Sequence, residues 1–257
     1  MSVHRIGMIV PSSNLTMETE LPRMLRDRQT VLPEDEFVFH ASRMRMKHVT
    51  PEGLAAMNAQ TERAALELAD ARPDVVTTAC LVAIMAQGPG SHCTAEDEIT
   101  AALRSEGATA PVVSSAGALL EGIAALGARR VAIVTPYLKP LTKMVADYIE
   151  DAGVEVVDAL SLEEPDNLAV ARLDPLDLRE HYKRLDLTNA DALVLSACVQ
   201  MPSLAAVQPV EDEAGLPVLT AAVATTWSIL TRLGLPTVVP GAGRLLSGEP
   251  AVAGASR

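Results

Sequence analysis

Aromatic side chains, cysteines and long apolar runs are all scarce in this chain. Tyr, Phe and Trp make up 2% of 257 residues, which argues against stacking on nucleic-acid bases and against an aromatic-lined pocket. Three cysteines are too few for a disulfide scaffold, so we expect free thiols in a reducing cytoplasm. No apolar run approaches the roughly 18 residues of a membrane span, and the stretch at 6–11 is too short for a signal peptide.

Positive charge is also in deficit. Lys and Arg number 21 against 33 Asp and Glu, which gives a net charge of −12. A field of that sign repels nucleic acid and anionic membranes, but a locally favourable pocket can still hold a small anion. The apolar content of 49% is that of a globular protein, and the length allows one or two domains.

Short β-branched runs alternate with longer amphipathic stretches. The runs are almost wholly apolar, as in parallel strands buried on both faces, and the alternation predicts an α/β fold. We expect strands at 5–10, 75–78, 112–114, 131–135, 154–157, 192–196 and 218–220. Helix starts are expected at Thr50-Pro51, at Asp174-Pro175, after Asn14 and at a capping box in 94–97, and the first of these helices should run on through Leu68.

Three sequence pairs repeat in the same order. Residues 8–11 resemble 132–136, 75–80 resemble 193–198, and 111–127 resemble 217–234. The spacing is too long for a solenoid and predicts two similar Rossmann-like halves with mainly parallel sheets, related by a pseudo-twofold axis, with the active site in the cleft between them. We place the first half at 1–115 plus 221–246 and the second at 116–220, with a loose tail at 247–257.

Two cysteines occupy matching positions in the repeat. Cys80 and Cys198 each follow a buried strand and precede a predicted helix, where ligands bind in open α/β sheets and where a helix start lowers a thiol pKa. A buried cysteine can also be a mere apolar side chain. Two at equivalent positions favour a catalytic pair facing one cleft. Cys93 beside His92 has no further ligands in register, so no metal site is expected.

Several motifs together resemble one family. Residues 7–20 (GMIVPSSNLTMETE), 78–83 (TACLVA), 134–137 (VTPY), Asn167 and 196–203 (SACVQMPS) are similar to the maleate cis-trans isomerases of the aspartate/glutamate racemase superfamily. The resemblance extends to about Leu246. Leu15 departs from it, because many relatives have Thr there.

The resemblance implies cofactor-free isomerisation of maleate to fumarate. Cys80 would be the nucleophile that forms a succinyl-cysteine, and Cys198 would be the proton donor. Covalent addition is needed because a C=C bond does not rotate at useful rates, whereas a C–C bond does. The two thiols must then hold different protonation states.

The resemblance also implies residues that bind the two carboxylates of the substrate. Taken alone, Asn14 and Asn167 would be turn or helix-cap residues, and Tyr137 a packing residue. The substrate is expected to be bound by the side chains of Asn14, Tyr137 and Asn167. Backbone N–H groups at Leu81, Val82, Val199 and Gln200 are expected to line the same cleft and to bind the substrate as well.

Two other functions stay open at this point. One is a racemase or decarboxylase that uses the same cleft, and the other is a non-catalytic dicarboxylate-binding protein. Related amino-acid racemases have Asn-Thr after the first cysteine and Thr-His after the second, where this chain has Leu81-Val82 and Val199-Gln200. The related decarboxylases use one cysteine. The resemblance also implies a homodimer or a higher homo-oligomer.

Overall fold

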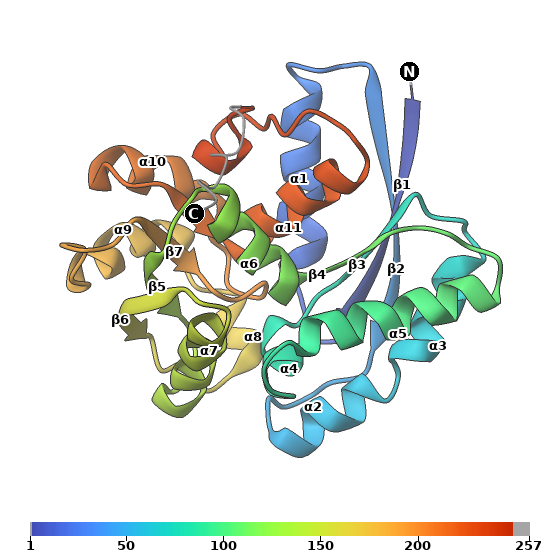
Figure 1. Cartoon of the computed structure of the whole chain (residues 1–257), viewed down its shortest axis with the longest axis horizontal. Helices are drawn as coiled ribbons and strands as arrows, with labels where there is room; N and C mark the ends of the chain where they lie inside the picture. The colour runs from blue at the N-terminus through green and yellow to red at the C-terminus, as the bar shows by residue number, and fades with distance from the viewer. Residues whose placement is uncertain (1, 249–257) are drawn as a thin grey trace.

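The computed structural model describes residues 2–248, which form two four-stranded parallel sheets (Figure 1). The strands are β1 Ser2–Pro11, β2 Asp35–Met44, β3 Val75–Thr78, β4 Val112–Ser114, β5 Arg130–Thr135, β6 Glu155–Ser161, β7 Ala192–Ser196 and β8 Val218–Thr220. The first sheet has the order β2-β1-β3-β4 and the second β6-β5-β7-β8. The two orders are equivalent, as the repeat in the sequence predicts, and the α/β fold class is confirmed.

Helices connect the strands in each sheet. They are α1 Met17–Gln29, α2 Pro51–Asn58, α3 Thr61–Ala69, α4 Leu81–Met85, α5 Ser91–Ser105, α6 Ser115–Ala125, α7 Lys139–Asp151, α8 Asn167–Val170, α9 Leu178–His181, α10 Leu204–Ala214 and α11 Ala221–Arg232. Single turns of 3-10 helix lie at Pro175–Asp177, Tyr182–Arg184 and Arg244–Leu246. No helix within residues 2–248 is both long and apolar enough to cross a membrane.

The helices α6 and α11 pack against each other between the two sheets (Figure 1). After leaving β8, α11 also contacts α1, β3 and β4 of the first sheet. The assignment of 221–246 to the first half and the boundaries of both halves stay predictions. From residue 249 on, the tail expected at 247–257 lies outside the described residues.

The strand β2 was not predicted from the sequence. β2 pairs with β1 over ten residues, but it lies at the edge of its sheet and most of its side chains are partly or fully exposed. An edge strand tolerates charged residues that a central strand does not, so its sequence DEFVFHASRM lacks the apolar run that marked the others.

Three helix predictions need correction. The helix predicted from Thr50 through Leu68 is two helices, because Gln60 leaves the helical conformation and its side chain hydrogen-bonds to the backbone of Arg45. The capping box at 94–97 is wrong: α5 begins at Ser91, and Glu96 instead accepts hydrogen bonds from Ser114. The segment opened by Asp174 is a run of single turns rather than one helix.

Candidate active site

One pocket contains all nine residues that the sequence predicted for the site. It lies at the carboxyl ends of the strands and has an empty volume of about 340 Å³, part of which is open to solvent. Three further residues line it: Pro11, Met46 and Val49. Met46 and Val49 follow the missed strand β2, which is why sequence reasoning did not place them here. Among residues 2–248, no Asp, Glu, Lys, Arg or His lines this pocket, so the described residues offer an anion only neutral donors.

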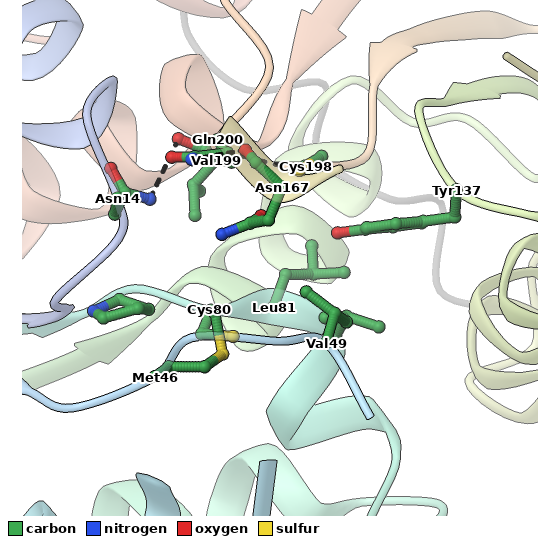
Figure 2. A pocket seen from close by; sticks show the side chains of 12 residues that line it. Asn14, Met46, Val49, Cys80, Leu81, Tyr137, Asn167, Cys198, Val199 and Gln200 are labelled. Atoms are coloured by element: carbon green, nitrogen blue, oxygen red, sulfur yellow. Dashed lines mark hydrogen bonds between the residues drawn. The ribbon is translucent and has the colours of Figure 1, made fainter. Parts of the chain in front are cut away.

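The two cysteines lie on opposite sides of this pocket (Figure 2). Each cysteine comes shortly after a central strand, and the residue just before it is hydrogen-bonded to the neighbouring strand. The Ala79 N–H donates to the Ile9 carbonyl at 2.8 Å, and the Ala197 N–H donates to the Val134 carbonyl at 3.0 Å. The repeated fold thus brings two thiols 118 positions apart in the chain to one cavity. Both are almost completely buried, with exposed fractions of 7% for Cys80 and 5% for Cys198.

The local backbone at the two cysteines differs. Cys80 is the residue before α4 and has the left-handed conformation, with φ 86° and ψ 64°. Such a conformation is costly for a non-glycine residue and is frequent at functional sites. Cys198 was expected at a helix start, but the next helix, α10, begins only at Leu204, so that expectation is wrong. The Cys198 sulfur instead accepts a hydrogen bond from the Gln200 N–H in a turn, at 3.4 Å.

Burial sets the direction of both thiol pKa values. Removal from water raises the pKa of Cys80 from 9.0 to about 12, although the Ala83 N–H acts against this rise. Burial likewise raises the pKa of Cys198, whose thiolate is stabilised by the Tyr137 hydroxyl and by the N–H groups of Gln200 and Met201. The sequence predicted a lowered pKa at both cysteines. Desolvation in an apolar pocket outweighs the few N–H groups that reach each sulfur.

The side chain of Asn14 forms hydrogen bonds in two directions. Its oxygen accepts from the N–H groups of Thr16 at 3.0 Å and Met17 at 2.8 Å, which caps α1 as the simpler interpretation proposed. Its amide nitrogen points toward the other half and donates to Val199 O at a long 3.5 Å (Figure 2). A ligand oxygen can compete for a donor held this weakly.

Asn167 and Tyr137 bring two more donors to the same pocket. The Asn167 amide nitrogen donates to the Ser13 hydroxyl at 2.8 Å, while the cap of α8 is supplied by Asp166. The Tyr137 hydroxyl points into the pocket (Figure 2), and burial raises the pKa of Tyr137 well above 10.0. It therefore stays protonated and serves as a donor at neutral pH.

The apolar lining and the metal-ligand inventory limit the chemistry. Leu81, Val82 and Val199 are buried and line the pocket beside the thiols. They exclude water from a covalent intermediate formed there. Within residues 2–248 no group of three or more His, Cys, Asp or Glu side chains is placed to hold a metal ion. The arrangement suits addition of a thiol to a small, doubly anionic alkene.

Known proteins resemble this chain over nearly its whole length. The family model described as arylmalonate decarboxylase matches residues 6–246. A maleate isomerase from Geobacillus stearothermophilus is 58% identical over 95% of this chain and 98% of its own.

Two solved structures resemble it as closely. The maleate isomerase of Pseudomonas putida S16, in a variant solved with maleate, has a TM-score of 0.95 and 54% identity over 97% of this chain and 100% of that one. A Nocardia farcinica maleate cis-trans isomerase variant, solved with a covalently bound succinylcysteine intermediate, has a TM-score of 0.93 and 51% identity over 96% and 100%. The chain belongs to the maleate isomerase family, within the aspartate/glutamate racemase superfamily.

Proposed function

We propose that this protein isomerises maleate to fumarate without a cofactor, through a succinyl-cysteine formed on Cys80. The observation that carries the proposal is the placement of two buried thiols on opposite sides of one neutral pocket that also holds the amides of Asn14 and Asn167. The relatives named maleate isomerase, one of them with a succinylcysteine intermediate, support the same reaction.

In the first half of the reaction, the Cys80 thiolate forms a C–S bond to one alkene carbon. The π-electron pair moves to the neighbouring carbon, which takes the proton of the Cys198 thiol and leaves that sulfur as a thiolate. The former double bond is now single and can rotate. The Tyr137 hydroxyl and the turn N–H groups stabilise the Cys198 thiolate at this stage.

The second half reverses these steps. The Cys198 thiolate removes a proton from the carbon that it protonated, the electron pair re-forms the double bond, and the C–S bond breaks to release fumarate. Cys80 leaves as a thiolate and Cys198 is again a thiol, so the enzyme is unchanged. Every proton and electron pair comes from the two cysteines and the substrate, and no step calls for a cofactor.

The different environments of the thiols fit these roles. Three donors stabilise the thiolate of Cys198, which eases loss of its proton, whereas one N–H group faces Cys80. A thiolate with few donors is the stronger nucleophile, because nucleophilicity rises with thiol pKa. The side chains of Asn14, Asn167 and Tyr137 and the N–H groups of residues 81, 82 and 199 are proposed to bind the carboxylates, whereas the Gln200 N–H donates to the Cys198 sulfur.

An amino-acid substrate is disfavoured by the same lining. None of the described residues that line the pocket has a carboxylate that would pair with a substrate ammonium group. Proton exchange at Cα of aspartate or glutamate in D₂O would support a racemase instead, and tight binding of maleate without turnover would support a binding protein.

The direct test follows vinyl protons by NMR after the pure protein is mixed with maleate, with no metal or nucleotide added. We expect the fumarate signal to grow while that of maleate declines. Intact mass spectrometry of a Cys198→Ser variant incubated with maleate should show an adduct of one maleate plus one proton, mapped to Cys80. No fumarate from the wild-type protein would refute the proposed function.

We further propose that the protein acts in the cytoplasm, where its thiols stay free, and that it forms a homodimer, as the family resemblance implies. Light scattering coupled to size-exclusion chromatography should give about twice the chain mass of 27.1 kDa. A monomer mass at micromolar concentration would contradict the dimer.

A further inference from the structure

The side chain of Gln200 is buried beside the proposed active site, and its hydrogen bonds are fully committed to the protein. It is 5% exposed. Its amide nitrogen donates to Ser13 O and to Asn167 O, both at 2.9 Å, and its amide oxygen accepts from the Leu15 N–H at 3.0 Å. Both amide hydrogens are therefore used, and neither is left for a substrate carboxylate.

These bonds join three segments that are distant in the chain. Ser13 and Leu15 flank Asn14 in the loop after β1, and the second carbonyl belongs to Asn167 itself. Figure 2 shows Gln200 between these two asparagines at one side of the pocket. The amide thus connects both proposed carboxylate-binding side chains to the loop that follows β7.

The backbone of the same residue reaches the proposed proton donor. The Gln200 N–H donates to the Cys198 sulfur at 3.4 Å, and the Gln200 carbonyl accepts from the Thr16 hydroxyl at 2.6 Å. One residue therefore contacts the loop of Asn14, the backbone of Asn167 and the sulfur of Cys198.

We propose that Gln200 is a positioning residue, whose buried amide sets the placement of Asn14, Asn167 and Cys198 around the substrate. This inference rests on the proposed function and revises the expectation that the backbone N–H of Gln200 binds substrate: that N–H donates to the Cys198 sulfur, and the side chain acts through its neighbours. No other residue type supplies the pattern in the same space, because Glu would place an anion against two carbonyl oxygens and Leu would leave three backbone groups unpaired.

The test compares Gln200→Glu with Gln29→Glu. Gln29 also donates its amide to a backbone carbonyl, that of Asp35, but it lies at the far end of α1 and does not line the pocket. We expect Gln200→Glu to lower kcat for maleate by about 10- to 100-fold while Gln29→Glu stays within about twofold of wild type. A Gln200→Glu variant as active as the control would overturn the inference.

A pH profile tests whether the charge introduced at position 200 causes the loss of activity. Once protonated, the carboxyl group of Gln200→Glu can donate one hydrogen bond again, so the activity ratio of this variant to wild type should rise as pH falls. A ratio that does not change with pH would count against the inference, because restoring a hydrogen-bond donor at this position would then have no effect on activity.

A measurement without turnover keeps this inference distinct from the proposed function. In Gln200→Glu, iodoacetamide should label Cys198 several-fold faster than in wild type, because the turn that holds its sulfur is loosened. Cys93, which is exposed on α5, should react at an unchanged rate and serves as an internal control. Unchanged labelling of Cys198 in Gln200→Glu would refute the positioning role, even if the wild-type protein isomerises maleate. If the variant shows faster labelling but the wild-type protein does not isomerise maleate, only the proposed reaction is refuted.

Discussion

The Tyr137 hydroxyl stabilises the thiolate form of Cys198, so the proposed proton donor depends on residues that follow two different strands, β5 and β7. Cys80, across the pocket, has no such side-chain partner. Tyr137, which belongs to neither cysteine motif, therefore adds to the asymmetry that the local backbone creates between the two cysteines.

Replacing Tyr137 by Phe removes this donor and preserves most of the ring packing. The Cys198 thiolate formed during the reaction then loses one of its hydrogen bonds, so we expect kcat/KM for maleate to fall about tenfold or more. Steady-state kinetics by NMR or ultraviolet absorbance measures the change. Wild-type kinetics in Tyr137→Phe would show that the hydroxyl does not serve the reaction.

Substituting either buried cysteine should stop turnover, but only a variant that keeps Cys80 should form a covalent adduct with maleate. Cys80→Ala and Cys198→Ala should each lower kcat by about 10³-fold or more, because each thiol performs a step that the other cannot. Mass spectrometry should find no maleate adduct on Cys80→Ala. The matched control is Cys93→Ala, which changes an exposed thiol outside the pocket and should retain full activity.

The pH dependence of the reaction should follow the thiolate of Cys80. Its pKa of about 12 lies far above neutrality, so the thiolate fraction grows about tenfold for each pH unit. The raised pKa of Cys198 keeps this proposed proton donor protonated over the same pH range. We expect log kcat/KM to rise with a slope near one between about pH 6.5 and 8.5. Because kcat/KM reports the free enzyme, a plateau in that interval would contradict a pKa of about 12 for Cys80.

Glu20 should make stability depend on pH. This side chain on α1 accepts hydrogen bonds from the N–H groups of Ser203 at 2.7 Å and Leu204 at 2.8 Å, at the start of α10. Burial raises its pKa above 4.5 despite these bonds. The folded state therefore binds more protons than the unfolded chain between 4.5 and the raised value, and the Glu20 contribution to stability falls as pH rises through that window.

Glu20→Gln removes this titration. The free energy of unfolding of the variant relative to wild type should therefore shift in favour of the variant as pH rises from about 4 to 7. Urea denaturation at several pH values measures the difference. A difference that is constant across this range, or that moves the other way, would contradict a raised pKa for Glu20.

The sequence carried most of the architecture because buried parallel strands leave a direct signature. Apolar runs located β1, β3 and β4 and all four strands of the second sheet, while the polar edge strand β2 gave no such signal. The two cysteines were found in the same way, as residues that end buried strands at matching places in a repeat. With β2 missed, Met46 and Val49 could not be assigned to the pocket.

What the sequence determined by itself was therefore the α/β class, the internal repeat and the identity of the paired thiols, since each depends on local pattern along the chain. Tertiary structure decided the pKa values of those thiols and the hydrogen bonds that position the residues around them. Their pKa values follow from desolvation by residues of both halves, and the bonds of Gln200 join atoms 33 to 187 positions apart in the chain. Burial and long-range hydrogen bonds exist only once the chain is folded, which is why a lowered pKa was predicted and a raised one was found.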